Sequence, residues 1–415
     1  MIDIKLLLKN PEKVKTAIKN RGVNIDVDKL ISLEEERKKL LQEVESLRKE
    51  QNDISPKVKD NPELLSKAKE LKASLKEKED ILDKLQEEFK KQSSLLPNIP
   101  LDDVPVGIDE TGNKVIREWG KVPKFKFEAK DHAELGKTLD LIDIERAAKI
   151  SGARFTYLKN ELALLEFALV QLAFDTLLKE GFIPIIPPIL IRDEMMKAMG
   201  YVDTEADLSE RYFLEKDKLF LIGTAEQSIG PMHQGEILDD LPKRYVAFST
   251  CLREESGSYG KDTKGIFRLH QFDKLEMFSF TKPEDSEKEH LFLLSLEEKM
   301  MQALKLPYRV VHLCTSDMSR PSASTYDIEA WFPSQNRYRE THSVSNCTDF
   351  QSRRLNIRFK GKDGKTEFVH MLNGTAFAMV RMLIAIIENY QRKDGKIDVP
   401  KVLQKYLGFK IIPKK

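Results

Sequence analysis

The most constraining feature of the sequence is residues 27–95, a densely charged segment without glycine. Of its 69 residues, 33 are Asp, Glu, Lys or Arg, and Phe89 is the only aromatic. Apolar residues still recur on alternating three- and four-residue steps in two registers if Arg37, Gln51 and Lys78 fill the gaps. Such heptad seams are typical of paired helices. The registers are Leu33, Leu40, Val44, Leu47 and Ile54, and then Ala68, Leu71, Leu75, Leu82, Leu85 and Phe89.

Residues 55–62 (SPKVKDNP) separate the two registers and indicate a turn, because their prolines and Asn61 end one helix and admit the next. We therefore expect an antiparallel two-helix coiled-coil arm, with helices of about 28 residues and roughly 40 Å. The ordinary role of such a hairpin is a solvated dimerisation or spacer coil. A binding role requires a second signal elsewhere in the chain.

Composition excludes several classes of protein. The chain has 69 Lys and Arg against 68 Asp and Glu, so it is no polycationic nucleic-acid coat, and any basic surface must be local. Cys251, Cys314 and Cys347 lie far apart, without the paired spacing of zinc ligands or a disulfide framework. No run approaches the roughly 18 apolar residues of a membrane span. We expect a cytoplasmic protein with no membrane partner.

The distribution of Pro and Gly predicts three parts. We expect an N-terminal domain at residues 1–100, a linker at 101–130 and a compact body at 131–415. In the body, six segments rich in β-branched or aromatic residues predict strands, at 245–253, 267–280, 308–314, 326–332, 353–359 and 368–372. Because many of them follow one another with turns between, the sheet should be mainly antiparallel.

Two helices and a short strand complete the predicted body. Residues 161–180 and 376–392 carry the apolar residues of helices that flank the sheet. The stretch GFIPIIPPIL (181–190) is β-rich but contains prolines, which suits a strand at a sheet edge or an interface. The predicted fold class is α+β, preceded by the helical arm.

Residues 248–280 carry the clearest chemical signal. Arg253 lies at the end of one strand, a Gly/Ser/Lys loop follows, and the next strand brings Arg268, Phe272 and Glu276. Such an arrangement can present a fixed guanidinium to a phosphate. Neither a P-loop nor a G-x-G-x-x-G motif is present, so a nucleotide must be bound by another device. Taken alone, Arg253 could equally pair with a neighbouring glutamate on the strand surface.

Together with two further stretches, this segment resembles the three motifs of class II aminoacyl-tRNA synthetases, in order. Residues 181–190 resemble motif 1 with Pro188 as its proline, the strand pair resembles motif 2, and LNGTAFAMVR (372–381) resembles motif 3 with Arg381 as its arginine. Further stretches, and the arm, are similar to the seryl-tRNA synthetase family. They are TAEQ (224–227), YDIEAW (326–331), SNCTDFQSRR (345–354) and DVPKVLQKYLG (398–408).

The resemblance implies a class II catalytic sheet and a ligase that forms seryl-adenylate from serine and ATP. The seryl group would then pass to tRNA(Ser), with selenocysteine tRNA as a further candidate acceptor. The arm would bind the tRNA, and a homodimer would form through motif 1 around Pro188. A non-catalytic RNA-binding paralogue would be expected to lack Arg253, Glu276, Glu340 or Arg381, and a ligase for a carrier protein would lack the arm.

The resemblance also implies the roles of single residues. Arg253 would hold the α-phosphate and Arg381 the γ-phosphate, and Phe272 would stack on adenine with Arg381 on its other face; Glu255 completes the catalytic set. The ATP-binding set is Arg253, Glu254, Glu255, Arg268, Phe272, Glu340, Thr341, His342, Ser343 and Arg381. The serine-binding set is Thr224, Ala225, Glu226, Arg253, Glu276, Asn373 and Thr375. Mg²⁺ would be held by Glu340 and Ser343, and no zinc is expected.

Three departures from the family pattern alter the surroundings of this site. Residues 315–319 (TSDMS) and Ser324 lack two glycines and a lysine that the family usually has, which predicts a stiffer turn and one positive charge fewer. His342 replaces a smaller residue beside the magnesium ligands, and we expect its side chain to face solvent. On single residues, simpler roles remain open: Phe272 as a core aromatic, Ser343 as a strand hydroxyl and Glu276 in a surface salt bridge.

Overall fold

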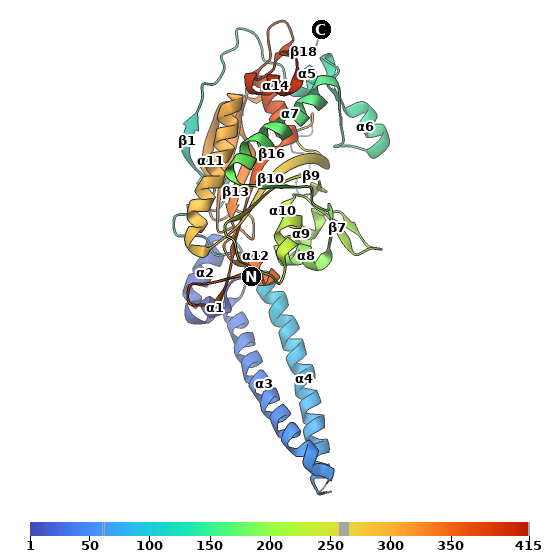
Figure 1. The fold of residues 1–415 in the computed structure, drawn as a ribbon, viewed down its shortest axis with the longest axis vertical. Helices are drawn as coiled ribbons and strands as arrows, with labels where there is room; N and C mark the ends of the chain where they lie inside the picture. The colour runs from blue at the N-terminus through green and yellow to red at the C-terminus, as the bar shows by residue number, and fades with distance from the viewer. Residues whose placement is uncertain (60, 62, 257–264, 414–415) are drawn as a thin grey trace. The chain divides into compact units, whose positions relative to one another are not determined.

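The computed structural model describes residues 1–59, 61, 63–256 and 265–413, and it divides into two compact units, Met1–Ile99 and Pro100–Lys415 (Figure 1). The loop predicted after Arg253 falls largely on residues 257–264 and lies outside the described residues. Among the residues described, no helix combines the length and apolar character needed to cross a membrane.

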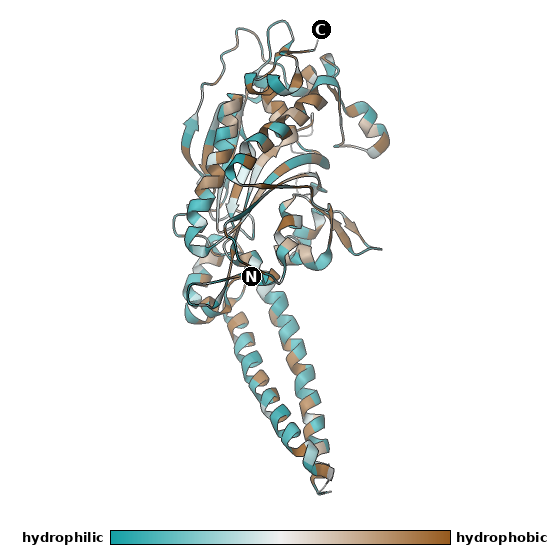
Figure 2. Ribbon diagram, in the orientation of Figure 1, coloured by the Kyte–Doolittle hydropathy of each residue, from teal (hydrophilic) through white to brown (hydrophobic). Residues whose placement is uncertain are grey.

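The first unit is built almost entirely of helices. Asp26 caps the long third helix by accepting a hydrogen bond from the Lys29 amide at 2.9 Å. This helix and the last one run antiparallel, and Figure 2 shows hydrophobic residues at intervals along their hydrophilic surfaces. The elements are α1 (Ile4–Lys9), α2 (Pro11–Asn20), α3 (Val27–Ile54), the 3₁₀ turn η1 (Ser55–Lys59) and α4 (Leu64–Ser94).

The seam between α3 and α4 follows the predicted heptads. Val44, Leu75 and Leu82 form its buried cluster, against which Leu40 and Leu47 pack. The charged residues in the seam have partners. Lys78 forms an ion pair with Glu43. Arg37 pairs with the buried Glu34 at 2.7 Å, and its guanidinium lies 5.9 Å from the centroid of the Phe89 ring. The two-helix arm and its seams are therefore confirmed.

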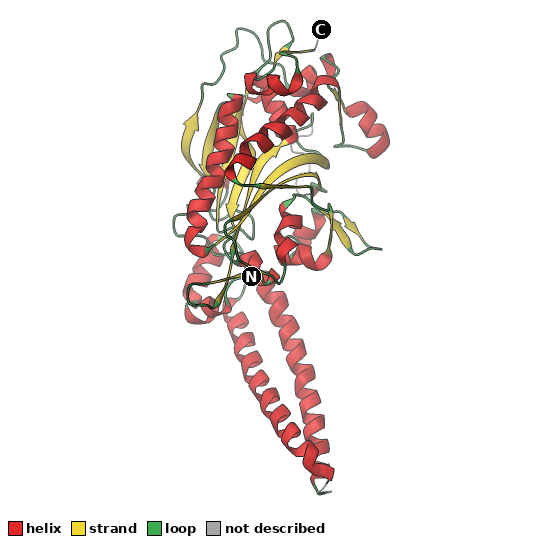
Figure 3. Cartoon of the chain, in the orientation of Figure 1, coloured by secondary structure: helices red, strands yellow, loops and turns green. Residues whose placement is uncertain are grey.

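The second unit is organised around an eight-stranded sheet (Figure 3). Every neighbouring pair in it is antiparallel except β4 and β9, which are parallel. The predicted antiparallel sheet and the edge position of residues 183–185 are confirmed. In sheet order, the strands are β1 (Lys114–Trp119), β11 (Tyr308–His312), β12 (Ser324–Phe332), β13 (Arg337–Asn346), β16 (His370–Ala378), β10 (Gln271–Thr281), β9 (Lys243–Leu252) and β4 (Ile183–Ile185).

Both faces of the sheet are covered, because successive residues of a strand point to opposite sides. On β10, Leu275 and Met277 join the larger core with α7 (Asn160–Leu177), α11 (Ser286–Leu304) and α13 (Met379–Asn389). Phe278 and Phe280 join a second core with α8 (Asp193–Met199), α10 (Glu226–Ile229) and α12 (Phe350–Leu355). The central strands are therefore buried on both sides.

Shorter elements surround these layers. The helical ones are η2 (Glu110–Gly112), α5 (His132–Thr138), α6 (Ile144–Ser151), η3 (Leu178–Glu180), α9 (Glu205–Ser209), η4 (Gly230–His233), η6 (Pro283–Asp285), η7 (Pro333–Gln335), η8 (Lys401–Leu403) and α14 (Gln404–Leu407). The strands are β2 (Ile142–Asp143), β3 (Tyr157–Leu158), β5 (Leu190–Arg192), β6 (Phe213–Leu214), β7 (Leu219–Leu221), β8 (Ile237–Leu238), β14 (Arg358–Lys360), β15 (Thr366–Phe368), β17 (Ile397–Asp398) and β18 (Ile411–Ile412).

Two secondary-structure predictions require correction. The strand predicted at 353–359 is wrong in its first half, which belongs to α12, where Arg353 pairs with Asp349 one turn earlier at 2.7 Å. Its last two residues do lie in a strand, β14. Residues 101–130 were expected to form a linker, yet β1 pairs with β11 and extends the sheet. Strand β13 was not predicted because its polar residues, RYRETHSVSN, give no apolar alternation.

Candidate active site

One pocket opens where β9, β10, β13, β16 and α13 meet. It brings together eight of the residues that the sequence predicted for ATP or serine: Arg253, Glu255, Arg268, Phe272, Glu340, Thr341, Thr375 and Arg381. Ile266, Phe267, Leu269, Lys274, Ala378 and Val380 complete its lining. The pocket therefore combines four cationic side chains with two aromatic rings, which suits a polyanion that carries a flat base.

Arg253 and Phe272 form one wall of the pocket. The Arg253 Nε donates to the Gly223 carbonyl oxygen at 3.0 Å, and its guanidinium lies 5.2 Å from the centroid of the Phe272 ring. Nearby, Arg268 Nη1 donates to Glu255 Oε2 at 2.8 Å. Glu255 has a φ of 51°, in the left-handed region, so the backbone turns sharply just after Arg253. Glu254 does not line the pocket, and its amide donates to the Glu210 carbonyl at 3.2 Å.

Arg381 forms another part of the pocket wall, at the start of α13. Its Nη1 pairs with Glu340 Oε1 at 2.8 Å and also donates to the Glu340 carbonyl at 3.1 Å. The Glu340 side chain is 49% exposed; its partial desolvation opposes ionisation, but Arg381 holds the pKa of its carboxyl below the ordinary value. The Arg381 guanidinium lies 5.3 Å from the centroid of Phe267, an aromatic residue that the sequence interpretation did not assign.

A buried ion pair continues the site inward along β10. Glu276 is 1% exposed and pairs with Lys274, whose Nζ also donates to Thr224 Oγ1 at 3.2 Å. Burial raises the pKa of Glu276 to about 7; Lys274 lowers it, and the neighbouring Glu226 raises it. Lys274 was not predicted, although it lies between Phe272 and Glu276 on the same face of the strand, where alternation would have revealed it.

The remaining residues of the predicted serine set surround this ion pair. Glu226 is buried and accepts a hydrogen bond from the Tyr201 hydroxyl, and burial raises its pKa. Thr375 lies opposite Glu276 on the neighbouring strand, and Asn373 lies opposite Phe278. Ala225 is fully buried in the second core. No sequence signal pointed to Tyr201, which comes from a distant segment.

Acidic and hydroxyl groups gather beside Glu340. Ser343 lies opposite Asp327 on the adjacent strand, and its hydroxyl forms a hydrogen bond with the Asp327 side chain. Asp327 Oδ1 is buried without a hydrogen-bond partner among the described residues, and burial together with Glu340 raises the Asp327 pKa. An orphaned carboxylate oxygen next to a second carboxylate fits a hard cation such as Mg²⁺. The sequence interpretation missed Asp327.

His342 corrects the expectation of a solvent-facing side chain. It is 1% exposed, its Nδ1 lies 2.9 Å from Thr341 Oγ1, and its ring packs edge-on against Phe377. The reason is that β13 lies inside the sheet, between β12 and β16. Burial lowers the pKa of His342 to about 3, so the imidazole is neutral near pH 7. Ser324, another departure, is also buried and lies 3.2 Å from the His312 ring.

The described residues contain no group of three or more His, Cys, Asp and Glu side chains placed to hold a metal ion. A site at Glu340 would therefore rely on hydroxyl oxygens, water or the phosphates of a ligand.

Comparison with known proteins places these features in a family. Residues 1–100 match the family described as "Seryl-tRNA synthetase N-terminal domain", and residues 212–390 match the "tRNA synthetase class II core domain (G, H, P, S and T)". The chain is 46% identical to the serine–tRNA ligase of Dictyoglomus thermophilum, with 100% of both chains covered. It is 41% identical to that of Nitrosopumilus maritimus, with 98% of this chain and 99% of the relative covered.

Solved structures agree. The seryl-tRNA synthetase of Pyrococcus horikoshii complexed with ATP superposes with a TM-score of 0.92 at 41% identity, covering 99% of each chain. The Giardia lamblia prolyl-tRNA synthetase with prolyl-adenylate is 15% identical with a TM-score of 0.56, over 65% of this chain and 54% of that one, and so shares the fold alone. The full-length identities, the two matching domains and the pocket together show that this chain belongs to the seryl-tRNA synthetase family.

Proposed function

We propose that the chain is a serine–tRNA ligase that activates serine with ATP and transfers the seryl group to tRNA(Ser). The observation that carries the proposal is the continuity of two recognition surfaces. The arginine-lined pocket leads along β10 directly to the buried pair of Glu276 and Lys274. An ATP in the arginine-lined pocket and an amino acid beside Glu276 and Lys274 would meet near Arg253.

The first half-reaction needs no covalent intermediate with the enzyme. The serine carboxylate attacks the α-phosphorus of ATP in line, the bond to the β-phosphate oxygen breaks, and pyrophosphate leaves. Arg253 would bind the α-phosphate oxygens, and Arg381 would bind the γ-phosphate once the nucleotide competes with Glu340 for its guanidinium. Catalysis then comes from positioning and from stabilisation of the charge that develops.

Recognition of serine would use the buried polar groups around Glu276. An ionised Glu276 would accept hydrogen bonds from the substrate ammonium, while the hydroxyls of Thr375 and Thr224 would form hydrogen bonds with the serine hydroxyl. Alanine would leave these buried groups unpaired, and such a penalty exceeds the loss of one apolar contact. The surroundings of Glu276 therefore favour serine over alanine, which lacks the hydroxyl.

Mg²⁺ would be held by Glu340 and Ser343, with Asp327 as a third oxygen donor. A bound Mg²⁺ would neutralise charge on the triphosphate oxygens. Before ATP binds, the chain keeps Glu340 ionised through Arg381, and it orients Ser343 through Asp327. Zinc is not part of the proposal.

A homodimer is proposed through motif 1. Close to the exposed Pro188 in sequence, and on helix α7, the second unit exposes large apolar side chains that a partner would cover. They are Leu164 (52% exposed), Phe167 (66%), Ile183 (47%), Ile186 (84%) and Ile189 (37%). We place the protein in the cytoplasm, where its substrates occur.

The helical arm is proposed to bind the tRNA. It contains neither Tyr nor Trp, and its one Phe is buried in the seam, so it offers no aromatic platform for stacked bases. Its Lys and Arg side chains suit phosphate contacts, and its rod shape suits a double-stranded feature such as a long variable arm. This assignment favours tRNA over a carrier protein as acceptor.

Separating the two half-reactions tests the proposal. Replacing residues 27–95 by a short Gly/Ser bridge should leave serine-dependent pyrophosphate exchange largely intact, because every pocket residue lies in the second unit. Charging of tRNA should fall strongly. Light scattering and thermal unfolding would first establish that the variant is folded and has the oligomeric state of the full chain. A folded variant that loses exchange, or that keeps full tRNA charging, would contradict this division of roles.

A further inference from the structure

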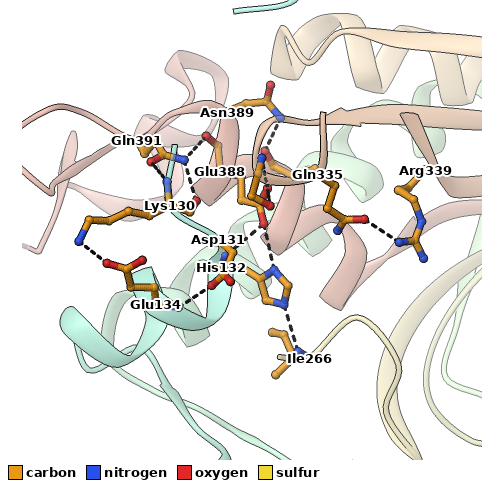
Figure 4. A network of polar contacts seen from close by, with 12 residues as sticks. Lys130, Asp131, His132, Glu134, Ile266, Gln335, Arg339, Glu388, Asn389 and Gln391 are labelled. Carbon is orange, nitrogen blue, oxygen red and sulfur yellow. Dashed lines mark hydrogen bonds and ion pairs between the residues drawn. The ribbon is translucent and has the colours of Figure 1, made fainter. Parts of the chain in front are cut away.

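A second polar network lies behind the nucleotide pocket, outside the predicted site (Figure 4). Its centre is Glu388, which is 0% exposed on α13. Glu388 Oε1 accepts from the His132 amide at 3.1 Å and lies 2.9 Å from His132 Nδ1, while Oε2 accepts from the Ser334 amide at 3.2 Å and from its hydroxyl at 2.7 Å. A buried carboxylate is tolerated when its oxygens are satisfied in this way.

The second nitrogen of His132 defines its protonation. The Ile266 amide donates to His132 Nε2 at 3.2 Å, so Nε2 carries the lone pair and Nδ1 carries the proton that is donated to Glu388. The imidazole is thus a neutral bridge between a carboxylate on α13 and a backbone amide at the entrance to β10. Both of its nitrogens are used.

Gly265 permits the close approach of this backbone. Its φ is +74°, and a Cβ at this position would lie 2.0 Å from His132 Nε2. Any side chain at residue 265 would push either the imidazole or the Ile266 amide away. The contact between His132 and the chain therefore depends on glycine for steric and conformational reasons.

The residue after Ile266 reaches the pocket. The Phe267 ring lies 5.3 Å from the Arg381 guanidinium and 3.9 Å from that of Arg339. Arg339 donates to Gln335 Oε1 at 2.7 Å, and Gln335 follows the Ser334 that binds Glu388. The contacts close a ring that runs from His132 through Glu388, η7, Arg339 and Phe267 back to Ile266, as Figure 4 shows in part.

Helix α13 joins this ring to the catalytic arginine. Arg381 and Glu388 are seven residues apart, two helical turns, and so lie on the same face of α13. Glu388 ties the end of the helix to His132, while Arg381 at its start contacts Phe267, which His132 holds through Ile266. Arg381 is therefore positioned from both its helix and its aromatic neighbour.

We propose that His132, held by Glu388, is a positioning residue for ATP binding: it fixes the Ile266 amide and so keeps Phe267 against Arg381. The role rests on the proposed function, because it acts through a residue assigned to the γ-phosphate. Loss of the contact between His132 and Ile266 should weaken ATP binding more than serine binding, because the residues proposed to bind serine lie farther along β10 around Glu276.

Two substitutions of His132 separate its two hydrogen bonds. In His132→Asn, the amide nitrogen can replace Nδ1 and donate to Glu388, but nothing reaches Ile266. In His132→Gln, the amide oxygen can replace Nε2 and accept from Ile266. In serine-dependent pyrophosphate exchange, we expect His132→Asn to raise the KM for ATP about tenfold with the KM for serine changed less than about twofold. His132→Gln should stay within about threefold of wild type for both.

Ser334→Ala provides the control. It removes the hydrogen bond from the Ser334 hydroxyl to Glu388 but leaves the contact between His132 and Ile266 in place. It should therefore lower thermal stability without raising the KM for ATP. Gly265→Ala provides an independent perturbation, since its Cβ displaces the same contact, and it should raise the KM for ATP as His132→Asn does.

The outcomes are decisive in either direction. The role would be overturned if folded His132→Asn and Gly265→Ala proteins had an unchanged KM for ATP. It would also be overturned if the KM values for ATP and serine rose equally, or if the Ser334→Ala protein showed the same rise in the KM for ATP as His132→Asn. If His132→Asn does not fold, Gly265→Ala decides alone. A wild-type protein without serine-dependent exchange would instead refute the proposed function, so the two failures are distinguishable.

Discussion

The ionisation of Glu276 predicts how serine activation depends on pH. Burial raises the pKa of this carboxyl to about 7, and only its charged form can bind the substrate ammonium. With that pKa, the ionised fraction falls from about 0.9 at pH 8 to about 0.1 at pH 6. We therefore expect kcat/KM for serine, measured by pyrophosphate exchange at saturating ATP, to fall about tenfold over this range.

Variants of the neighbouring residues test the cause of this pH dependence. Lys274 lowers the pKa of Glu276 and Glu226 raises it, so Lys274→Met should move the acid limb to higher pH and Glu226→Gln should move it to lower pH. Glu276→Gln should abolish the limb and lower kcat/KM roughly 10- to 150-fold, the loss of a hydrogen bond to a charged group. A flat profile between pH 6 and pH 8 in the wild-type protein, or wild-type kcat/KM in Glu276→Gln, would refute the assignment of Glu276.

Two further predictions concern the nucleotide. Arg381→Lys should lower pyrophosphate exchange by roughly 100-fold without unfolding the protein, because an ammonium cannot form two parallel hydrogen bonds to phosphate oxygens while lying over Phe267. Near-normal exchange would count against the role of Arg381. Exchange should stop when EDTA removes Mg²⁺ and return when Mg²⁺ is added; stoichiometric zinc in the active protein, with activity lost on its removal, would contradict the proposed oxygen-ligand site.

The arm and the sheet were predictable because their residues follow a simple period. The heptads of residues 27–95 determine which side chains face the partner helix, and Val44, Leu75 and Leu82 are buried as the period requires. Alternating apolar residues likewise marked β9, β10 and β12. Strand β13 was not predicted because most of its residues are polar even where they are buried, so the strand shows no apolar alternation.

Contacts between distant segments could not be predicted from local patterns. Residues 353–359 have β-branched and aromatic character, but α12 forms because Phe350 and Leu355 pack into the protein, and Arg354 pairs with Asp203 at 2.8 Å. Tyr201 binds Glu226, which lies 25 residues later, and His132 binds Glu388, which lies 256 residues later. The motifs named eight of the residues that line the pocket. Lys274, Phe267 and the supporting side chains emerged only from the fold.

The most direct test of the central claim is amino-acid-dependent pyrophosphate exchange with serine, threonine, alanine and glycine under matched conditions. The buried polar groups around Glu276 predict exchange with serine, and a kcat/KM for alanine lower by roughly 10⁴-fold, because alanine leaves those groups unpaired. Threonine and glycine should also be far poorer substrates. Comparable exchange with alanine, or none with serine in a folded protein supplied with ATP and Mg²⁺, would contradict the account.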